Sequence, residues 1–404
     1  DKNVAIGHGA LQSANYDGEA CNIAVGFDAG VLVSTGIGNT IMGAYAGDAL
    51  TAGSKNIAIG YGALSTEDDH GKNVAVGYSA LNAQNAGADA YNVAVGYHAG
   101  LLVSTGAQNT VIGGLAGDAL TTGSNSTFVG YAAGSAGTIA SFNTAIGHAA
   151  LAQNVAAQLN TAIGNNALYA MTAATSTNTY NTAVGHNAGL SVTSGTFNTL
   201  IGGLAGDALT TGTAGNVAVG YQALSAQVEY GQNVAIGTQA LRDQNVNSHG
   251  NNVAVGHQAG LSVSTGTSNT LIGSLAGDAL TSGSYNVVLG MFALSTEDTG
   301  GRNVAIGYKA LEDLNYAGSG YNVAIGYEAG KDVSTGIENI LIGGKTGDAL
   351  TSGSYSIAIG RDALGTETTN SHNIAIGYGS MSSSELSAKN VAVGSNALQN
   401  ITHG

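Results

Sequence analysis

One short motif, Asn–Val–Ala–Ile–Gly in its commonest form, recurs along nearly the whole chain and constrains the fold more than any other feature. It occurs 23 times between Asn3 and Gly394. Most of the closing glycines lie 17 residues apart, a few lie 18 or 19 apart, and one pair lies 21 apart. A repeat this short cannot bury its apolar residues alone, so it must stack on its neighbours as one coil of a solenoid.

The motif predicts a strand that ends at its glycine. The residues three and one before each glycine are β-branched or aliphatic, and they share a face because strand side chains alternate. The glycine then permits a sharp turn. We therefore predict an all-β, parallel β-solenoid of about 23 coils, mostly 17 residues long.

The repeat predicts one continuous array over residues 1–404. The coils form cycles of four, about 70 residues long, giving five cycles and a partial one, with an additional coil near Gly164. One coil of each cycle carries Val-Ser-Thr-Gly or a close variant, and the next carries Ala-Gly-Asp-Ala-Leu-Thr or a close variant. No polar capping coil is seen at either end, so we expect an excerpt of a longer fibre.

Both faces of the predicted strand are apolar. The residue two before the glycine faces away from the other two, and it is Ala in most coils and larger in one class. A thin coil has only one interior, so the second face needs another cover. We expect a homo-oligomer, with a thicker coil that buries both faces as the alternative. The larger residues of that class are Ile41, Val111, Leu200, Leu271 and Leu341.

Asparagine opens the motif in 21 coils, with Ser126 and Ser356 in the other two. Stacked Asn side chains can hydrogen-bond along a parallel array, and Asn tolerates the left-handed backbone of a turn. We expect a structural ladder that begins with Asn3, Asn22, Asn39, Asn56, Asn73 and Asn92.

An aromatic residue often follows the closing glycine. Such a stripe could contact glycans, because aromatic faces suit sugar rings, or it could pack between neighbouring coils or chains, which we favour. The candidate surface residues are Tyr61, Tyr78, Tyr97, Tyr131, Tyr308 and Tyr327.

Composition excludes several classes of function. Only 9 % of the residues are charged and the net charge is −15, which disfavours nucleic acid and anionic membranes as partners. The lone Cys21 excludes a disulfide framework. No apolar run approaches the ~18 residues of a membrane span, so we expect no membrane insertion.

We expect neither a metal, a cofactor nor catalysis. One Asp recurs in each cycle, but successive copies lie roughly 19 Å apart, too far to supply the six to eight oxygens of a calcium site, so we expect these residues to bond within turns. Ser and His occupy repeat positions and form no unique set of nucleophile, base and orienting group. The recurring residues are Asp48, Asp118, Asp207, Asp278 and Asp348.

The extended motif Asn-Val-Ala-Ile-Gly-x-x-Ala-Leu, as in Asn3–Leu11, Asn73–Leu81 and Asn303–Leu311, resembles the YadA-like head repeats of trimeric autotransporter adhesins. It is also similar to repeats of bacteriophage tail fibres. The resemblance implies a left-handed parallel β-roll, three chains side by side, and a role in adhesion or host attachment. The coils here are longer than adhesin coils, which are near 14 residues, and look more like the phage-fibre version.

These observations predict an extracellular fibrous protein, namely a tail-fibre segment of a virion that contacts a host cell-surface glycan or protein. A bacterial trimeric adhesin head is the first alternative, with the cell surface as its location. A self-assembling extracellular filament subunit is the second. Ice binding is disfavoured because Thr alternates with Val and Ile at the best-ordered position.

Overall fold

The computed structural model describes residues 2–16, 18–173, 175–211, 215–383 and 388–400. Those residues form short parallel strands joined by turns, and no helix occurs among them. The structure confirms the coarser prediction of an all-β parallel solenoid, with about 22 turns. It divides into two compact units, Asp1–Asn198 and Thr199–Gly404.

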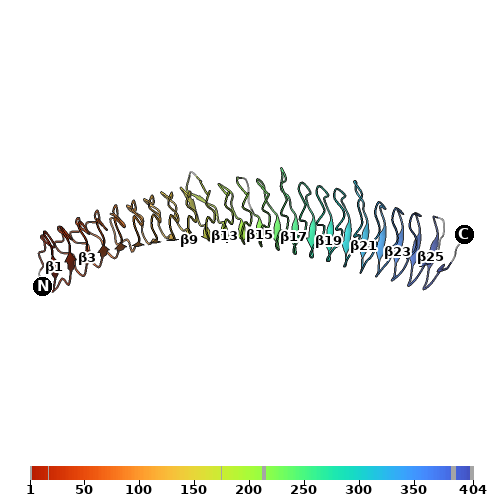
Figure 1. The fold of residues 1–404 in the computed structure, drawn as a ribbon, viewed down its shortest axis with the longest axis horizontal. Coiled ribbons are helices and arrows are strands. Elements are labelled where there is room, and N and C mark those ends of the chain that lie inside the picture. The colour runs from red at the N-terminus through yellow and green to blue at the C-terminus, as the bar shows by residue number, and fades with distance from the viewer. Residues whose placement is uncertain (1, 17, 174, 212–214, 384–387, 401–404) are drawn as a thin grey trace. The chain divides into compact units, whose positions relative to one another are not determined.

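In the first unit, each turn supplies one three-residue strand to a parallel stack (Figure 1). The strands of the stack are β1 (Val4–Ile6), β2 (Ile23–Val25), β3 (Thr40–Met42), β4 (Ile57–Ile59), β5 (Val74–Val76), β6 (Val93–Val95), β7 (Thr110–Ile112), β8 (Thr127–Val129), β9 (Thr144–Ile146), β11 (Thr161–Ile163) and β13 (Thr182–Val184). A separate parallel pair, β10 (Ala157–Gln158) and β12 (Thr177–Asn178), forms where the third cycle has its additional coil.

The second unit repeats the same arrangement. Its strands are β14 (Thr199–Ile201), β15 (Val217–Val219), β16 (Val234–Ile236), β17 (Val253–Val255), β18 (Thr270–Ile272), β19 (Val287–Leu289), β20 (Val304–Ile306), β21 (Val323–Ile325), β22 (Ile340–Ile342), β23 (Ile357–Ile359), β24 (Ile374–Ile376) and β25 (Val391–Val393).

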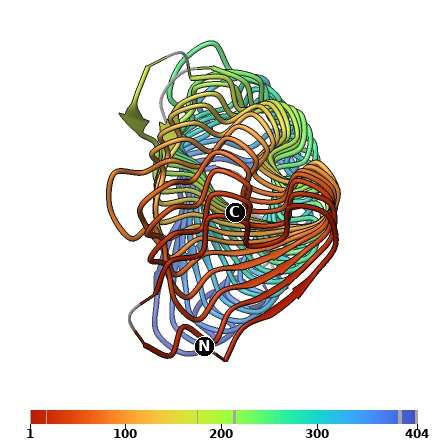
Figure 2. The ribbon, with the colours of Figure 1, turned by 90° about the vertical axis from the view of Figure 1, so that its left-hand side faces the viewer.

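Strand pairing keeps the motif in register within each unit. For example, Val74 pairs with Val93 and Ala75 with Ala94, so equivalent positions of successive motifs stand one above another. Figure 2 views the turns end-on and shows the narrow loop that each one makes. Every side-chain position of the motif therefore becomes a column that runs along the stack.

The interior of the loop is filled by the middle residue of each strand. Ala75 and Ala94 are fully buried, whereas the two residues that flank each of them are exposed or half-buried. Ala three residues after the closing glycine is also buried in most turns. The thicker coil that would bury both strand faces is therefore not what this chain forms, because the residues three and one before the closing glycine remain exposed or half-buried.

Glycines leave space for the larger side chains of the core. Ile41 is fully buried in place of the usual Ala, and a Cβ on Gly30 would lie 2.8 Å from its Cδ1 atom. In many other turns the position of Gly30 is Leu, as at Leu64 and Leu81. The bulky side chain thus moves from one column to another while the cross-section stays the same, which explains why the coils come in classes.

Candidate functional surfaces

The outward strand residues form the first candidate surface. We call the side chains three and one before each closing glycine the lateral face. Ile112 and Ile146 are each 38 % exposed on this face, and Val95 is 36 % exposed. Every residue at these positions is Val, Ile, Thr, Leu or Met, without a single charge. Sheets that face water normally carry polar residues on that side, so the composition is that of a buried surface.

The motif asparagines form a column of hydrogen bonds beside the strands. The backbone N–H of Asn39 donates to Oδ1 of Asn22 at 2.8 Å, and Oδ1 of Asn39 accepts from the N–H of Asn56 at 2.8 Å. Nδ2 of Asn39 donates to the carbonyl of Gly53, also at 2.8 Å. Asn3 accepts from the N–H of Asn22 in the same way. The column continues through Asn73 and Asn92.

Serine can replace asparagine in this column. Oγ of Ser126 accepts from the N–H of Asn143, but at a longer distance of 3.3 Å. All the asparagines from Asn22 to Asn92 that open a motif are buried. Their role in the structure is to satisfy backbone groups between turns, where water does not reach.

The aromatic residues after the closing glycines stack on one another along the chain. The rings of Tyr61 and Tyr78 lie 5.2 Å apart and nearly parallel, and those of Tyr78 and Tyr97 lie 5.5 Å apart. In the second unit, Tyr308 and Tyr327 stack at 5.5 Å. We call these side chains the tyrosine column. The rings contact one another and yet stay exposed, with Tyr61 49 % and Tyr97 55 % accessible to solvent.

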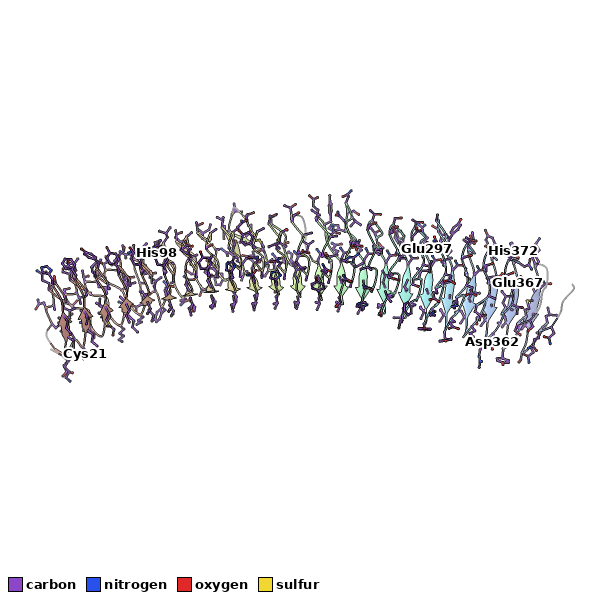
Figure 3. All side chains as sticks on the ribbon, in the orientation of Figure 1. Cys21, His98, Glu297, Asp362, Glu367 and His372 are labelled. Carbon is purple, nitrogen blue, oxygen red and sulfur yellow. The ribbon has the colours of Figure 1, made fainter. Side chains whose placement is uncertain are left out.

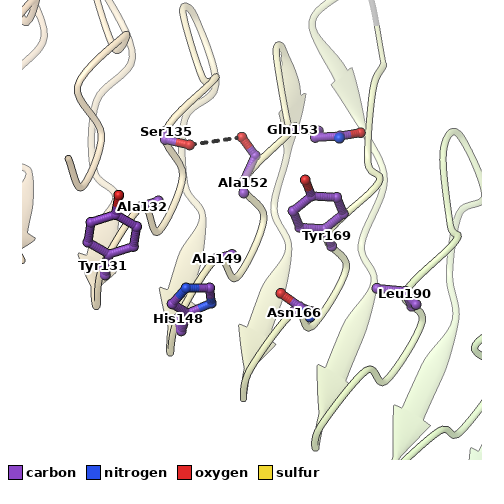
Figure 4. Close-up of a pocket in the computed structure, with 10 residues that line it drawn as sticks. All are labelled: Tyr131, Ala132, Ser135, His148, Ala149, Ala152, Gln153, Asn166, Tyr169 and Leu190. Carbon is purple, nitrogen blue, oxygen red and sulfur yellow. Dashed lines mark hydrogen bonds between the residues drawn. The ribbon is translucent and has the colours of Figure 1, made fainter. Parts of the chain in front are cut away.

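Tyr131 is separate from these stacks and lines a hollow in the first unit. Its ring stacks on His148 at 5.6 Å, and small side chains such as Ala149 and Ala152 leave a space of about 540 Å³ (Figure 4). Gln153 and Asn166 bring amide groups to its wall, and Tyr169 a second aromatic ring. A hollow with aromatic and amide side chains is chemically suited to a polar ring such as a sugar.

A second exposed column was missed by the sequence reasoning. It consists of the residues immediately before the motif Asn, many of which have a left-handed backbone, for example Tyr285 at φ 64°. The guanidinium carbon of Arg302 lies 5.3 Å from the ring centre of Tyr285 and 5.6 Å from that of Tyr321. The signal was present in the sequence, because Tyr or Phe recurs at this position in several coils.

The recurrent aspartates lie in separate turns. Oδ1 of Asp118 is buried without a hydrogen-bond partner, and burial raises the pKa of its carboxyl group, partly offset by nearby backbone N–H groups. The pKa values of Asp48, Asp207, Asp278 and Asp348 are raised for the same reason. The free thiol of Cys21 is exposed (Figure 3).

No protein-family model matches this chain, and no curated protein matches its sequence. Among the residues that the structure describes, no helix is both long enough and apolar enough to cross a membrane.

Proposed function

We propose that this chain is a fibrous attachment protein that works as a side-by-side homotrimer of left-handed coils, as a segment of a bacteriophage tail fibre. The observation that carries the proposal is the lateral face. It is uncharged at every position of the motif and yet remains exposed or half-buried in the single chain. Copies of the same chain are the simplest cover for it, because identical repeats match one another in spacing all along a stack.

The choice of three copies and of the coil's hand comes from the resemblance of the motif to adhesin and phage-fibre repeats. The role we assign is mechanical. Stacked turns with continuous hydrogen-bond columns make a stiff element that carries a receptor-binding part or offers many weak contacts to a host surface. No catalytic role and no cofactor belong to this proposal.

Sedimentation of the purified chain tests the assembly. We expect a particle of about three times the chain mass of 39.6 kDa. A stable monomer at micromolar concentration contradicts the proposal. Growth into ever longer particles as the concentration rises would favour the filament alternative instead.

Immunogold labelling of the source culture tests the biological setting. An antibody against the purified chain should label the tails of cell-free virions. Label on the bacterial surface in virion-free cells would favour the adhesin alternative.

Host-glycan contact is a second candidate function, favoured by the exposed tyrosine column. We expect the triple variant Tyr61→Ala, Tyr78→Ala, Tyr97→Ala to lose at least tenfold in binding to a glycan array. The matched control is Tyr180→Ala, Tyr285→Ala, Tyr355→Ala, which removes three exposed rings outside the column. If both triple variants bind the glycan array equally well, the tyrosine column serves in packing and does not contact glycans.

A further inference from the structure

A single turn of the first unit brings together a buried carboxylate, a second carboxylate and an imidazole. Glu67 is fully buried, while Asp68 and His70 are half-buried at the same turn. One ligand atom from each of the three lies within 4.8 Å of the other two. This grouping arises from residues within one turn, so the distance between repeats that separates the recurrent aspartates does not apply to it.

The buried groups of this turn lack partners. Neither carboxylate oxygen of Glu67 has a hydrogen bond in the described structure, and neither does Nδ1 of His70. The backbone N–H groups of His70 and Ala86 lie near enough to lower the pKa of Glu67, but neither is in hydrogen-bond geometry with it, and burial raises this pKa more than they lower it. An unpaired buried carboxylate is costly, so the turn needs a cation or a proton.

Two other turns carry a glutamate at the position of Glu67, seven residues after the closing glycine, and there the carboxylate accepts hydrogen bonds. Oε1 of Glu297 accepts from the N–H of Gly300 at 2.7 Å, and Oε2 accepts from the N–H of Tyr316 at 3.2 Å. Glu367 accepts from the N–H of Asn370 at 3.2 Å. Glu297 and Glu367 serve as acceptors for backbone groups, and neither has a histidine three residues later.

The spacing of the Glu67 turn fits one metal ion. Nδ1 of His70 lies 3.7 Å from Oε1 of Glu67, which is too long for a hydrogen bond. Two ligand atoms that each lie ~2.0–2.1 Å from a tetrahedral cation are about 3.3 Å from each other. A small shift of the His70 side chain toward Glu67 would bring Nδ1 and Oε1 to this separation. One imidazole with two carboxylates suits Zn²⁺, whereas Ca²⁺ requires more oxygens than the turn offers.

We propose that Glu67, Asp68 and His70 form a binding site for one divalent transition-metal ion, with Zn²⁺ as the best match. This departs from the sequence-based expectation of no metal. The preceding turn helps to hold the site in place, because the carbonyl of Asp68 accepts from the N–H groups of Thr51 and Gly53. With three protein ligands, the remaining position is open to water, and the half-exposed Asp68 and His70 leave the ion a route from solvent.

The test uses the full, tag-free chain, stripped with a chelator and titrated with Zn²⁺ in a calorimeter, with bound metal counted by equilibrium dialysis. We expect one equivalent per chain and binding at least tenfold weaker in Glu67→Gln and His70→Asn. Both variants should fold, because Gln227 and Asn370 occupy the equivalent positions of other turns. Co²⁺ in place of Zn²⁺ should give the visible absorption of a low-coordinate site, lost in His70→Asn.

Glu297→Gln is the matched control, since it removes a buried carboxylate from the same repeat position, and it should bind like the unmodified chain. The proposal is overturned if the unmodified chain binds no stoichiometric Zn²⁺ below 100 µM. It is overturned equally if Glu67→Gln and His70→Asn both bind as the unmodified chain does, which would mean that other histidines hold the ion. An ion pair between Glu67 and protonated His70 would then satisfy the turn.

Discussion

At the scale of single residues, the closing glycine of the motif is required by the backbone it adopts. Gly343 has φ +139°, and a Cβ there would lie 2.7 Å from the carbonyl oxygen of Gly360 in the next turn. The neighbouring Gly344 has an ordinary φ, and the nearest atom to its Cβ position is 4.0 Å away. Adjacent glycines of one turn therefore have very different reasons for being present.

This contrast gives a prediction. Gly343→Ala should lower the free energy of unfolding by about 3 kcal/mol, because it combines backbone strain with a backbone clash. Gly344→Ala should change it by less than about 0.5 kcal/mol. Urea unfolding followed by circular dichroism measures both, and a similar loss in the two variants would contradict this explanation.

The recurrent aspartates and Glu297 predict how stability varies with pH. Burial of their carboxyl groups raises their folded pKa values above the ordinary 3.8 of Asp and 4.5 of Glu. The folded chain therefore holds protons that the unfolded chain has released, so stability is greatest below the unfolded values and falls as pH rises through the folded ones. The groups are Asp48, Asp118, Asp207, Asp278, Asp348 and Glu297.

We accordingly expect the melting temperature to rise as the pH is lowered from 7 toward the unfolded carboxyl values of about 4. Asp89 opposes the trend, because Lys72 lowers its pKa, but it is one exposed group against six. Asp278→Asn should reduce the dependence of the melting temperature on pH. A melting temperature that falls steadily between pH 7 and pH 4 would show that other groups dominate.

At the scale of the element, one turn is held to the next by its asparagine as well as by its strand. Asn39 takes part in three hydrogen bonds that cross between segments of the chain. Asn39→Ala should cost about 2–3 kcal/mol, because the N–H of Asn56 and the carbonyl of Gly53 lose their partners without gaining water. Asn39→Ser should cost roughly half as much, as Ser126 keeps one of these bonds. If Asn39→Ala and Asn39→Ser lower the free energy of chemical unfolding equally, the hydrogen bonds of this side chain do not contribute to stability.

The strand and its period were predictable from sequence because alternation and the glycine act locally. Which strand face lies inside was not, since Ala75 on one side and Val74 and Val76 on the other are all apolar. The structure places the middle residue of the strand inside and leaves its two neighbours at the surface. The proximity of Glu67 and His70 was also not predictable from the repeat pattern, because it depends on the path of the backbone in one turn.

At the scale of the whole molecule, the proposed trimer depends on the lateral face. Burying apolar side chains contributes about 25 cal/mol per Å², and here the same uncharged positions recur in every turn of both units. A charge placed on a covered apolar face must lose its water, whereas the same charge on an open surface keeps it. Substitution by lysine can therefore distinguish a covered face from an exposed one.

The last prediction applies this reasoning to three strands of one stretch of the first unit. The triple variant Ile112→Lys, Ile146→Lys, Ile163→Lys, on β7, β9 and β11, should sediment as a monomer. Its control, Ile37→Lys, Leu102→Lys, Ile139→Lys, adds the same charge at exposed apolar residues outside the lateral face. The control should remain a trimer, because water still surrounds its new charges. A lateral variant that stays trimeric would place the contact between copies on another surface.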